Sequence, residues 1–138
     1  MEEFITRNEN ETLEVAAKFA TTLSAGNIIL LNGDLGAGKT VFTKGVVSAL
    51  SGGNVIAVSP TFVIVNTYNT QPVVNHFDLY RIEDVSELEA IGIEEYLYSD
   101  AINIVEWSER AIELFPNDSI VVEILKVDDN TRKIRIER

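Results

Sequence analysis

The segment Gly33–Thr40 reads Gly-Asp-Leu-Gly-Ala-Gly-Lys-Thr, which is a complete phosphate-binding loop motif. Its glycines allow positive φ angles, so that successive backbone N–H groups can surround an anion. In this motif the Lys39 ammonium contacts the β- and γ-phosphates of a nucleotide, and the Thr40 hydroxyl can ligate Mg²⁺. We therefore predict a nucleotide-phosphate site made by Gly33, Gly36, Ala37, Gly38, Lys39, Thr40 and Val41.

Two acidic residues are candidates for the chemistry that follows phosphate binding. Asp78 and Glu106 each end an apolar run where a strand should reach the carboxyl edge of the sheet, beside the phosphates. Phosphoryl transfer needs a held Mg²⁺ and an oriented nucleophile, and carboxylates suit both roles. We assign Glu106 to the metal, because its strand reads as the more central one, and Asp78 to the attacking water or to an indirect metal contact. The alternative for each is a solvated acid at a strand end, since the chain has 22 acidic residues.

The segment Ser59-Pro60-Thr61 follows the loop helix, a position typical of switch segments in nucleotide hydrolases. Its hydroxyls could sense the γ-phosphate or Mg²⁺, and Thr61 is a catalytic candidate beside Asp78 and Lys39. The alternative is an ordinary turn in which Pro60 fixes φ.

Other residues near the two acids have both structural and functional interpretations. His76 is the only histidine, and its strand position beside Phe77 favours a packed, hydrogen-bonded residue over a catalytic base. Arg81 could stabilise transition-state charge, but nearby acids favour an ion pair. Tyr80 and Trp107 are interpreted as core or interface aromatics that brace the acids.

The elements that must position these residues indicate an α/β class. A strand at 28–32 and a helix at 39–50 flank the phosphate loop, and two extended runs, 62–68 and 73–79, read as a β-hairpin. We also expect strands at 4–5, 102–105, 119–127 and 133–137, and helices from Asn8 to before Gly26 and at 87–91, 94–98 and 108–115. The chain is thus predicted to be a single domain, 1–138, with a three-layer fold of P-loop NTPase type and a mixed central sheet, parallel with an antiparallel hairpin.

Two local signals refine this expectation. Asn8 and Glu11 have the spacing of a capping box at a helix start. Gly45 lies inside the loop helix, where glycine costs up to ~1 kcal/mol relative to alanine. We expect close packing on the sheet to explain it.

Composition limits the partners of this chain. Its 138 residues are 46% hydrophobic and carry a net charge of −11, from 22 acidic and 11 basic residues. A protein this acidic is poorly suited to hold a polyanion alone. We therefore expect any nucleic acid to be held mainly by partners. No apolar run approaches the ~20 residues of a membrane span, the start Met1-Glu2-Glu3 argues against a signal peptide, and no cysteine is present. We expect a cytoplasmic protein with no membrane association.

Five motifs together resemble one family. They are GDLGAGKT (Gly33 to Thr40), SPTF (Ser59 to Phe62), HFDLYR (His76 to Arg81), ELEAIGIEEY (Glu87 to Tyr96) and VEW (Val105 to Trp107). Their order and spacing resemble the TsaE family, also called YjeE, of bacterial tRNA threonylcarbamoyladenosine biosynthesis proteins. The resemblance implies a small P-loop ATPase that uses ATP and Mg²⁺ and joins two partner subunits, TsaB and TsaD. These proteins form threonylcarbamoyladenosine next to the anticodon; TsaD carries out the transfer and the ATPase resets or drives the complex.

The resemblance also implies residue roles. Gly36 to Thr40 would bind phosphates, Thr40 and Glu106 would ligate Mg²⁺, and Asp78 would assist hydrolysis. Ser59 and Thr61 would belong to the switch-like segment.

The adenine would lie between the N-terminal segment and the C-terminal hairpin, near Asn10 and Arg132. The chain departs from the family at Val41, where a second threonine is common, and in its short C-terminus, which leaves the base-binding edge open.

Alternative functions use the same loop. A small-molecule kinase would need a lid that excludes water, and no arginine-rich lid segment is evident. A GTPase would carry an Asn-Lys-x-Asp signature, which is absent. A nucleotide-gated assembly module with negligible turnover stays open, because activity is expected to be weak alone and to depend on partners.

Overall fold

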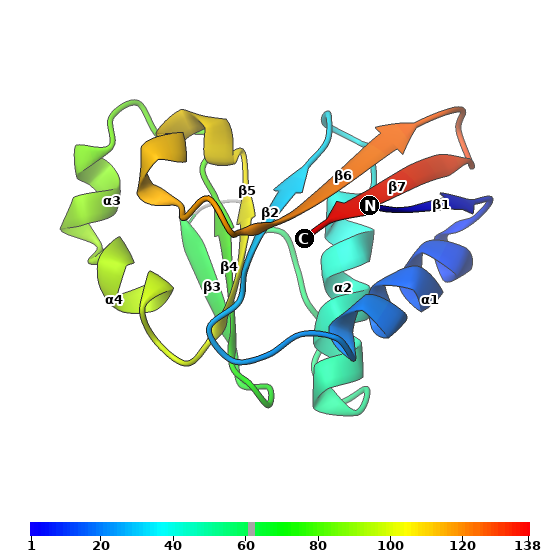
Figure 1. The fold of residues 1–138 in the computed structure, drawn as a ribbon, viewed down its shortest axis with the longest axis horizontal. Coiled ribbons are helices and arrows are strands. Elements are labelled where there is room, and N and C mark those ends of the chain that lie inside the picture. Colours follow the sequence, from blue (N-terminus) through cyan, green and yellow to red (C-terminus); the bar gives the residue numbers. More distant parts are fainter. Residues whose placement is uncertain (61–62) are drawn as a thin grey trace.

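The computed structural model describes residues 1–60 and 63–138, in which one seven-stranded sheet forms the centre (Figure 1). Its strand order is β1-β7-β6-β2-β5-β4-β3. The strands are β1 (Glu2–Thr6), β2 (Ile28–Asn32), β3 (Val65–Tyr68), β4 (Val74–Asp78), β5 (Ile102–Glu106), β6 (Ile120–Lys126) and β7 (Arg132–Glu137). The helices are α1 (Glu9–Ala20), α2 (Lys39–Ser51), α3 (Ser86–Ala90), α4 (Ile93–Leu97) and the 3₁₀-helix η1 (Ser108–Leu114).

The sheet is parallel at its centre and antiparallel at both edges. Strand β2 pairs in parallel with β5 and with β6, and β5 pairs in parallel with β4. Strand β3 closes one edge as a hairpin with β4, and β7 and β1 close the other. The predicted α/β class with a mixed sheet is confirmed, and β5 is central as expected.

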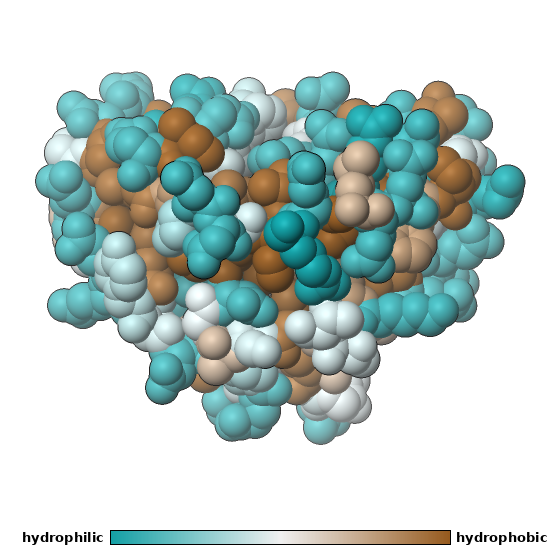
Figure 2. All heavy atoms as spheres, in the orientation of Figure 1, coloured by the Kyte–Doolittle hydropathy of each residue, from teal (hydrophilic) through white to brown (hydrophobic). Residues whose placement is uncertain are grey.

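Two hydrophobic clusters place a helical layer on each face of the sheet. In β2, Ile29 and Leu31 belong to the cluster under α1 and α2, whereas Ile28 and Leu30 belong to the cluster under α3, α4 and η1. All four side chains are buried, because a central parallel strand is covered on both faces. Figure 2 shows hydrophilic residues over much of the face in view, with hydrophobic residues visible between them.

The start of α1 is a capped helix terminus. The Asn8 side chain accepts a hydrogen bond from the Glu11 N–H at 2.9 Å, and the Glu11 carboxylate accepts one from the Arg7 N–H at 2.9 Å. The predicted capping pair is therefore confirmed, although Glu11 reaches the residue before the cap. Such a cap is worth about 1 kcal/mol, and it fixes the edge of the site described below.

Three expectations need correction. The segment expected as a helix at 108–115 is a 3₁₀-helix, and the non-helical backbone of Ala111 (φ −153°, ψ 42°) interrupts it. Strand β3 begins at Val65 instead of 62, and residues 61 and 62 lie outside the described part.

Among residues 1–60 and 63–138, no helix is long and apolar enough to cross a membrane.

The third correction concerns Gly45, which packs against α1 and not on the sheet. A Cβ atom at this position would lie 2.6 Å from the Ala16 Cβ and 3.0 Å from the Leu13 carbonyl oxygen. The absence of a side chain lets α1 and α2 approach closely. The predicted close packing is present, but the predicted partner, the sheet, was wrong. Sequence spacing does not say which helix covers α2.

Replacing Gly45 with alanine should therefore destabilise the protein, although alanine is the better helix former by ~1 kcal/mol. Overpacking of a closed contact typically costs about 1–3 kcal/mol, and urea unfolding would measure it. Ala49→Gly, at an exposed position of the same helix, is the matched control for helix propensity alone. A Gly45→Ala protein more stable than the wild type would contradict the packing explanation.

Candidate functional site

The loop between β2 and α2 has the backbone conformation of an anion-binding turn. Gly36 has φ 80° and Gly38 has φ 109°, both in the region that favours glycine. Gly38 also caps α2, so Lys39 and Thr40 form its first turn. The positive end of a 13-residue helix therefore faces this loop.

A cavity of about 410 Å³ opens at the loop. It is bounded by the loop, the start of α1, the carboxyl ends of β4 and β5, and the C-terminal hairpin. Its lining residues are Asn8, Glu9, Thr12, Leu35, Gly36, Gly38, Lys39, Thr40, Val41, Ser59, Asp78, Tyr80, Glu106, Trp107, Asp129, Asn130 and Arg132.

Three buried polar side chains form a cluster beside this cavity. The Lys39 Nζ lies 3.6 Å from Glu106 Oε1, and His76 Nε2 lies 2.5 Å from Glu106 Oε2. The three residues are only 6%, 5% and 0% exposed for Lys39, Glu106 and His76. Because buried charges are costly unless paired, the Glu106 carboxylate is the shared partner that keeps the cluster in place.

Each oxygen of Glu106 has a different neighbour. An ionised carboxylate only accepts hydrogen bonds, so His76 Nε2 is the donor to Oε2. The other ring nitrogen, Nδ1, is buried and has no hydrogen-bond partner within residues 1–60 and 63–138. His76 thus holds one oxygen of Glu106 while the other faces Lys39. The expectation of a packed, hydrogen-bonded histidine agrees with this arrangement.

Asp78 lies directly across from Glu106 in the β4–β5 register. Its Oδ1 accepts a hydrogen bond from the Tyr80 N–H at 2.9 Å. Partial burial raises the pKa of Asp78 above the ordinary aspartate value; the Tyr80 N–H opposes this rise and the nearby Glu106 charge adds to it. The two candidate acids therefore meet at one edge, as strand-end reasoning predicted.

Two aromatic side chains line the same cavity as this pair of acids. The Tyr80 and Trp107 rings lie 4.9 Å apart, and the Lys39 Nζ lies 4.2 Å from the centre of the Trp107 ring. Trp107 has φ 59°, which is unusual for a residue with a side chain. This backbone conformation directly follows Glu106 and places the indole against Lys39. The braces expected from sequence are adjacent to both the metal candidate and the lysine.

The remaining predicted residues have different places. Gly33, the first residue of the loop, packs against β6, where a Cβ atom would be 2.8 Å from the Ile124 carbonyl oxygen. Ala37 is buried at 2% exposure. Asn10 is exposed on α1 and is not among the residues that line the cavity. Thr61 lies outside the described residues.

Sequence reasoning did not identify several residues of the cavity wall. Thr12 in α1 and Asp129 and Asn130 in the C-terminal turn line it. The turn itself was predicted from its Asp-Asp-Asn sequence, but nothing in that sequence says that it folds over the phosphate loop.

The donor set fits Mg²⁺. Within the described residues no group of three or more His, Asp or Glu side chains could hold a metal by itself. Mg²⁺ usually takes one or two protein oxygens together with phosphates and water. The Thr40 hydroxyl and the Glu106 carboxylate line the same cavity and supply two such hard oxygens. A metal held jointly with a nucleotide would bind to these two residues.

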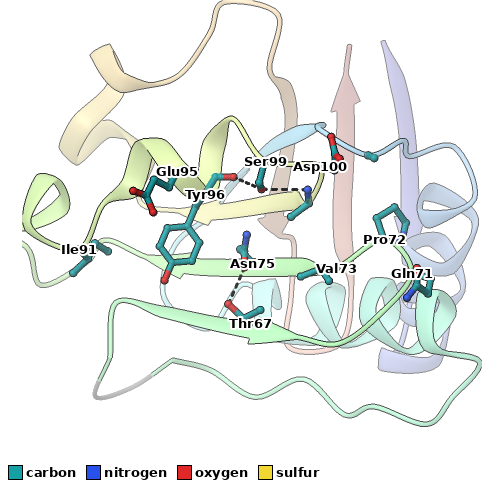
Figure 3. Close-up of a pocket in the computed structure, with 12 residues that line it drawn as sticks. Thr67, Gln71, Pro72, Val73, Asn75, Ile91, Glu95, Tyr96, Ser99 and Asp100 are labelled. Carbon is teal, nitrogen blue, oxygen red and sulfur yellow. Dashed lines mark hydrogen bonds between the residues drawn. The ribbon is translucent and has the colours of Figure 1, made fainter.

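A second and larger cavity, about 960 Å³, lies at the opposite ends of the parallel strands (Figure 3). Its lining includes Ala25, Val73 and Ala101, which come just before β2, β4 and β5. Some of its polar groups bond to one another: Thr67 donates to Asn75 at 2.8 Å, and the Ser99 hydroxyl donates to the Tyr96 carbonyl at 2.7 Å. No predicted site residue in the described part lines it. We therefore assign the functional site by charge and chemistry and not by volume.

Comparison with known sequences gives a family match over nearly the whole chain. The family model "Threonylcarbamoyl adenosine biosynthesis protein TsaE" matches residues 6–134. The chain is 41% identical over 133 residues to the tRNA threonylcarbamoyladenosine biosynthesis protein TsaE of Rickettsia bellii, covering 96% of this chain and 92% of the relative. The protein of the same name from Aquifex aeolicus is 41% identical over 140 residues, covering 100% and 97%.

A solved structure supports the same relationship. The crystal structure of Bacillus subtilis YdiB has a TM-score of 0.78 and 30% sequence identity, and the match covers 96% of this chain and 82% of that chain. The predicted three-layer fold of P-loop NTPase type is confirmed.

Replacing Glu106 with alanine should cost about 3–5 kcal/mol of unfolding free energy, because Lys39 and His76 lose their shared buried partner. Urea unfolding would measure the loss. Glu109→Ala, at an exposed position three residues later, is the control and should change stability by less than about 0.5 kcal/mol. A Lys39→Met change in the Glu106→Ala background should recover part of the loss. Equal stability of Glu106→Ala and its control would contradict the charge cluster.

Replacing Asp78 with asparagine should stabilise the ligand-free protein at neutral pH. A carboxyl group with a raised pKa in the folded state stabilises the fold below its unfolded pKa, and this contribution is lost as pH rises through the folded value. The advantage of Asp78→Asn over wild type should therefore grow from acidic to neutral pH, as measured by urea midpoints. Asp118→Asn, an exposed site, controls for the loss of one negative charge. A pH-independent difference would refute this sign.

Proposed function

The chain belongs to the TsaE family, and from this membership we propose that it is a Mg²⁺-dependent ATPase that supports threonylcarbamoyladenosine modification of tRNA. The family model and the curated relatives carry this modification in their names. The observation that supports the nucleotide role most directly is the Lys39–Glu106 pair at the phosphate loop.

The roles of individual residues follow from the geometry of the cavity. The loop N–H groups and the first turn of α2 would bind the phosphates, and Lys39 would move from Glu106 to the triphosphate. Thr40 and Glu106 would hold Mg²⁺, which supplies charge stabilisation at the β- and γ-phosphates when bound.

Asp78 is suited to orient the attacking water. It lines the cavity across from Glu106, and its raised pKa brings the carboxyl group closer to the range of a useful proton acceptor. Ser59 also lines the cavity and belongs to the proposed switch segment.

We propose that turnover is weak until TsaB and TsaD complete the site. Arg132 is the arginine that lines the described cavity, and its guanidinium donates to backbone carbonyls. We propose that a further cation on the transferred phosphoryl group comes from a partner, which is the role of an arginine finger. The net charge of −11 fits a protein whose partners contact the tRNA.

The test is Mg²⁺-dependent ATP turnover by the protein alone and with the TsaB–TsaD pair. We expect strong stimulation by the pair. Stimulated assembly with no change in turnover would favour a nucleotide-gated module. No stimulation, together with a phosphorylated small-molecule acceptor, would favour a kinase.

Replacing Asp78 with alanine should leave ATP affinity near the wild-type value and lower turnover by about a hundredfold. Calorimetric ATP titration and phosphate release by the stimulated complex separate the two effects. Asp118→Ala removes an acid from the exposed surface and is the control. Unchanged turnover in Asp78→Ala would remove this residue from the mechanism.

A further inference from the structure

The C-terminal hairpin is attached to the phosphate loop by one side chain. Arg132, the first residue of β7, extends its guanidinium to the backbone of a loop 95 residues earlier in the chain. Its Nε donates to the Ala37 carbonyl at 2.7 Å, and its Nη2 donates to the Gly36 carbonyl at 3.4 Å. Two consecutive carbonyl groups of the loop therefore face the same planar side chain.

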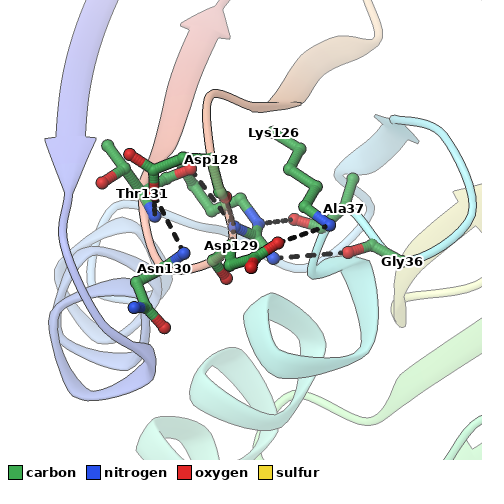
Figure 4. Close-up of polar contacts among 8 residues, drawn as sticks. Gly36, Ala37, Lys126, Asp128, Asp129, Asn130 and Thr131 are labelled. Carbon is green, nitrogen blue, oxygen red and sulfur yellow. Dashed lines mark hydrogen bonds and ion pairs between the residues drawn. The ribbon is translucent and has the colours of Figure 1, made fainter.

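The other side of the guanidinium bonds to the hairpin turn. Its Nη1 donates to the carbonyl oxygens of Asp128 at 2.8 Å, Asp129 at 3.2 Å and Thr131 at 3.2 Å. The turn is itself fixed, because the Asp128 carboxylate accepts the N–H groups of Asn130 at 3.0 Å and Thr131 at 2.8 Å. Arg132 thus joins this turn to the loop, and Figure 4 shows the labelled turn residues beside Gly36 and Ala37 of the loop.

The bond to the Ala37 carbonyl helps to set which way the peptide between Ala37 and Gly38 points. A peptide group is planar and trans, so its N–H points opposite to its carbonyl. With the Ala37 carbonyl on Arg132, the N–H of Gly38 points away from the guanidinium. Anion-binding loops need their N–H groups directed away from their own protein acceptors and toward the ligand.

We propose that Arg132 is a positioning residue that holds the phosphate loop in its anion-binding conformation. This inference rests on the proposed nucleotide function. The fork shape of the Arg132 guanidinium is essential, because one rigid plane reaches two loop carbonyls and the turn at once. The resemblance-based expectation placed Arg132 at the adenine instead. An arginine has five N–H donors, and Nε, Nη1 and Nη2 are all in use on carbonyls.

The two roles differ in what they do to a ligand without a base. We would measure binding of ATP, GTP and inorganic tripolyphosphate to wild type and Arg132→Gln by calorimetry. A positioning role predicts that all three ligands bind more weakly, each on the order of tenfold, with the ATP-to-GTP ratio unchanged. Unchanged tripolyphosphate binding with a reduced ATP-to-GTP ratio would overturn the inference in favour of base contact.

Two further variants test the fork itself. Arg132→Lys keeps the positive charge and most of the stem but cannot reach both carbonyls, so it should bind tripolyphosphate almost as weakly as Arg132→Gln. It also keeps the test usable if Arg132→Gln does not fold. Arg135→Gln removes an arginine from the same strand, where it pairs with Glu3 and Glu123, and should bind like wild type. Full rescue by Arg132→Lys would show that charge alone suffices and would overturn the inference.

The wild-type protein separates this inference from the function on which it rests. If wild type binds neither ATP nor tripolyphosphate, the proposed nucleotide function fails. If wild type binds both and Arg132→Gln binds them equally well, the nucleotide function stands and the positioning role of Arg132 fails.

Discussion

A lysine and a glutamate that are both almost fully buried need each other as partners in the ligand-free protein, and this requirement fixes where three parts of the chain meet. Lys39 begins α2, Glu106 ends β5, and His76 in β4 bonds to the same carboxylate. A single unpaired charge at this depth would cost several kcal/mol. The parallel pairing of β5 with β2 and β4 is what brings the three side chains together. The cluster and the sheet therefore stabilise each other.

The same pair makes the site responsive to an anion. In the ligand-free structure Glu106 supplies the negative charge that Lys39 needs, and the Trp107 ring lies against the ammonium from another side. Under the proposed function, a triphosphate would replace Glu106 as the partner of Lys39. The released Glu106 oxygen would then require a cation of its own, while His76 continues to hold the other oxygen. Binding of the anion and of Mg²⁺ would be coupled through one carboxylate.

The sequence predicted those features that depend on local patterns. The loop between β2 and α2, the capped start of α1 and the two strand-end acids follow from spacing over a few residues, because turns, caps and strand edges have local chemistry. Contacts between distant segments were not predictable. Gly45 could have packed on the sheet or on α1, and Arg132 reaches across 95 residues. No spacing rule signals the 3₁₀ geometry of η1 or the non-helical backbone of Ala111 that interrupts it.

The distribution of positive charge at the cavity bears on how the site would work. In the ligand-free structure Lys39 pairs with Glu106, and Arg132 donates to carbonyl groups of both the loop and the turn. A guanidinium that positions the loop cannot also move onto a phosphoryl group without releasing the turn. Under the proposed function Lys39 moves onto the phosphates and Arg132 stays on the loop, so a further cation for a developing negative charge would come from a partner. Under this proposal the same contacts that preform the phosphate loop would also make the site depend on a partner.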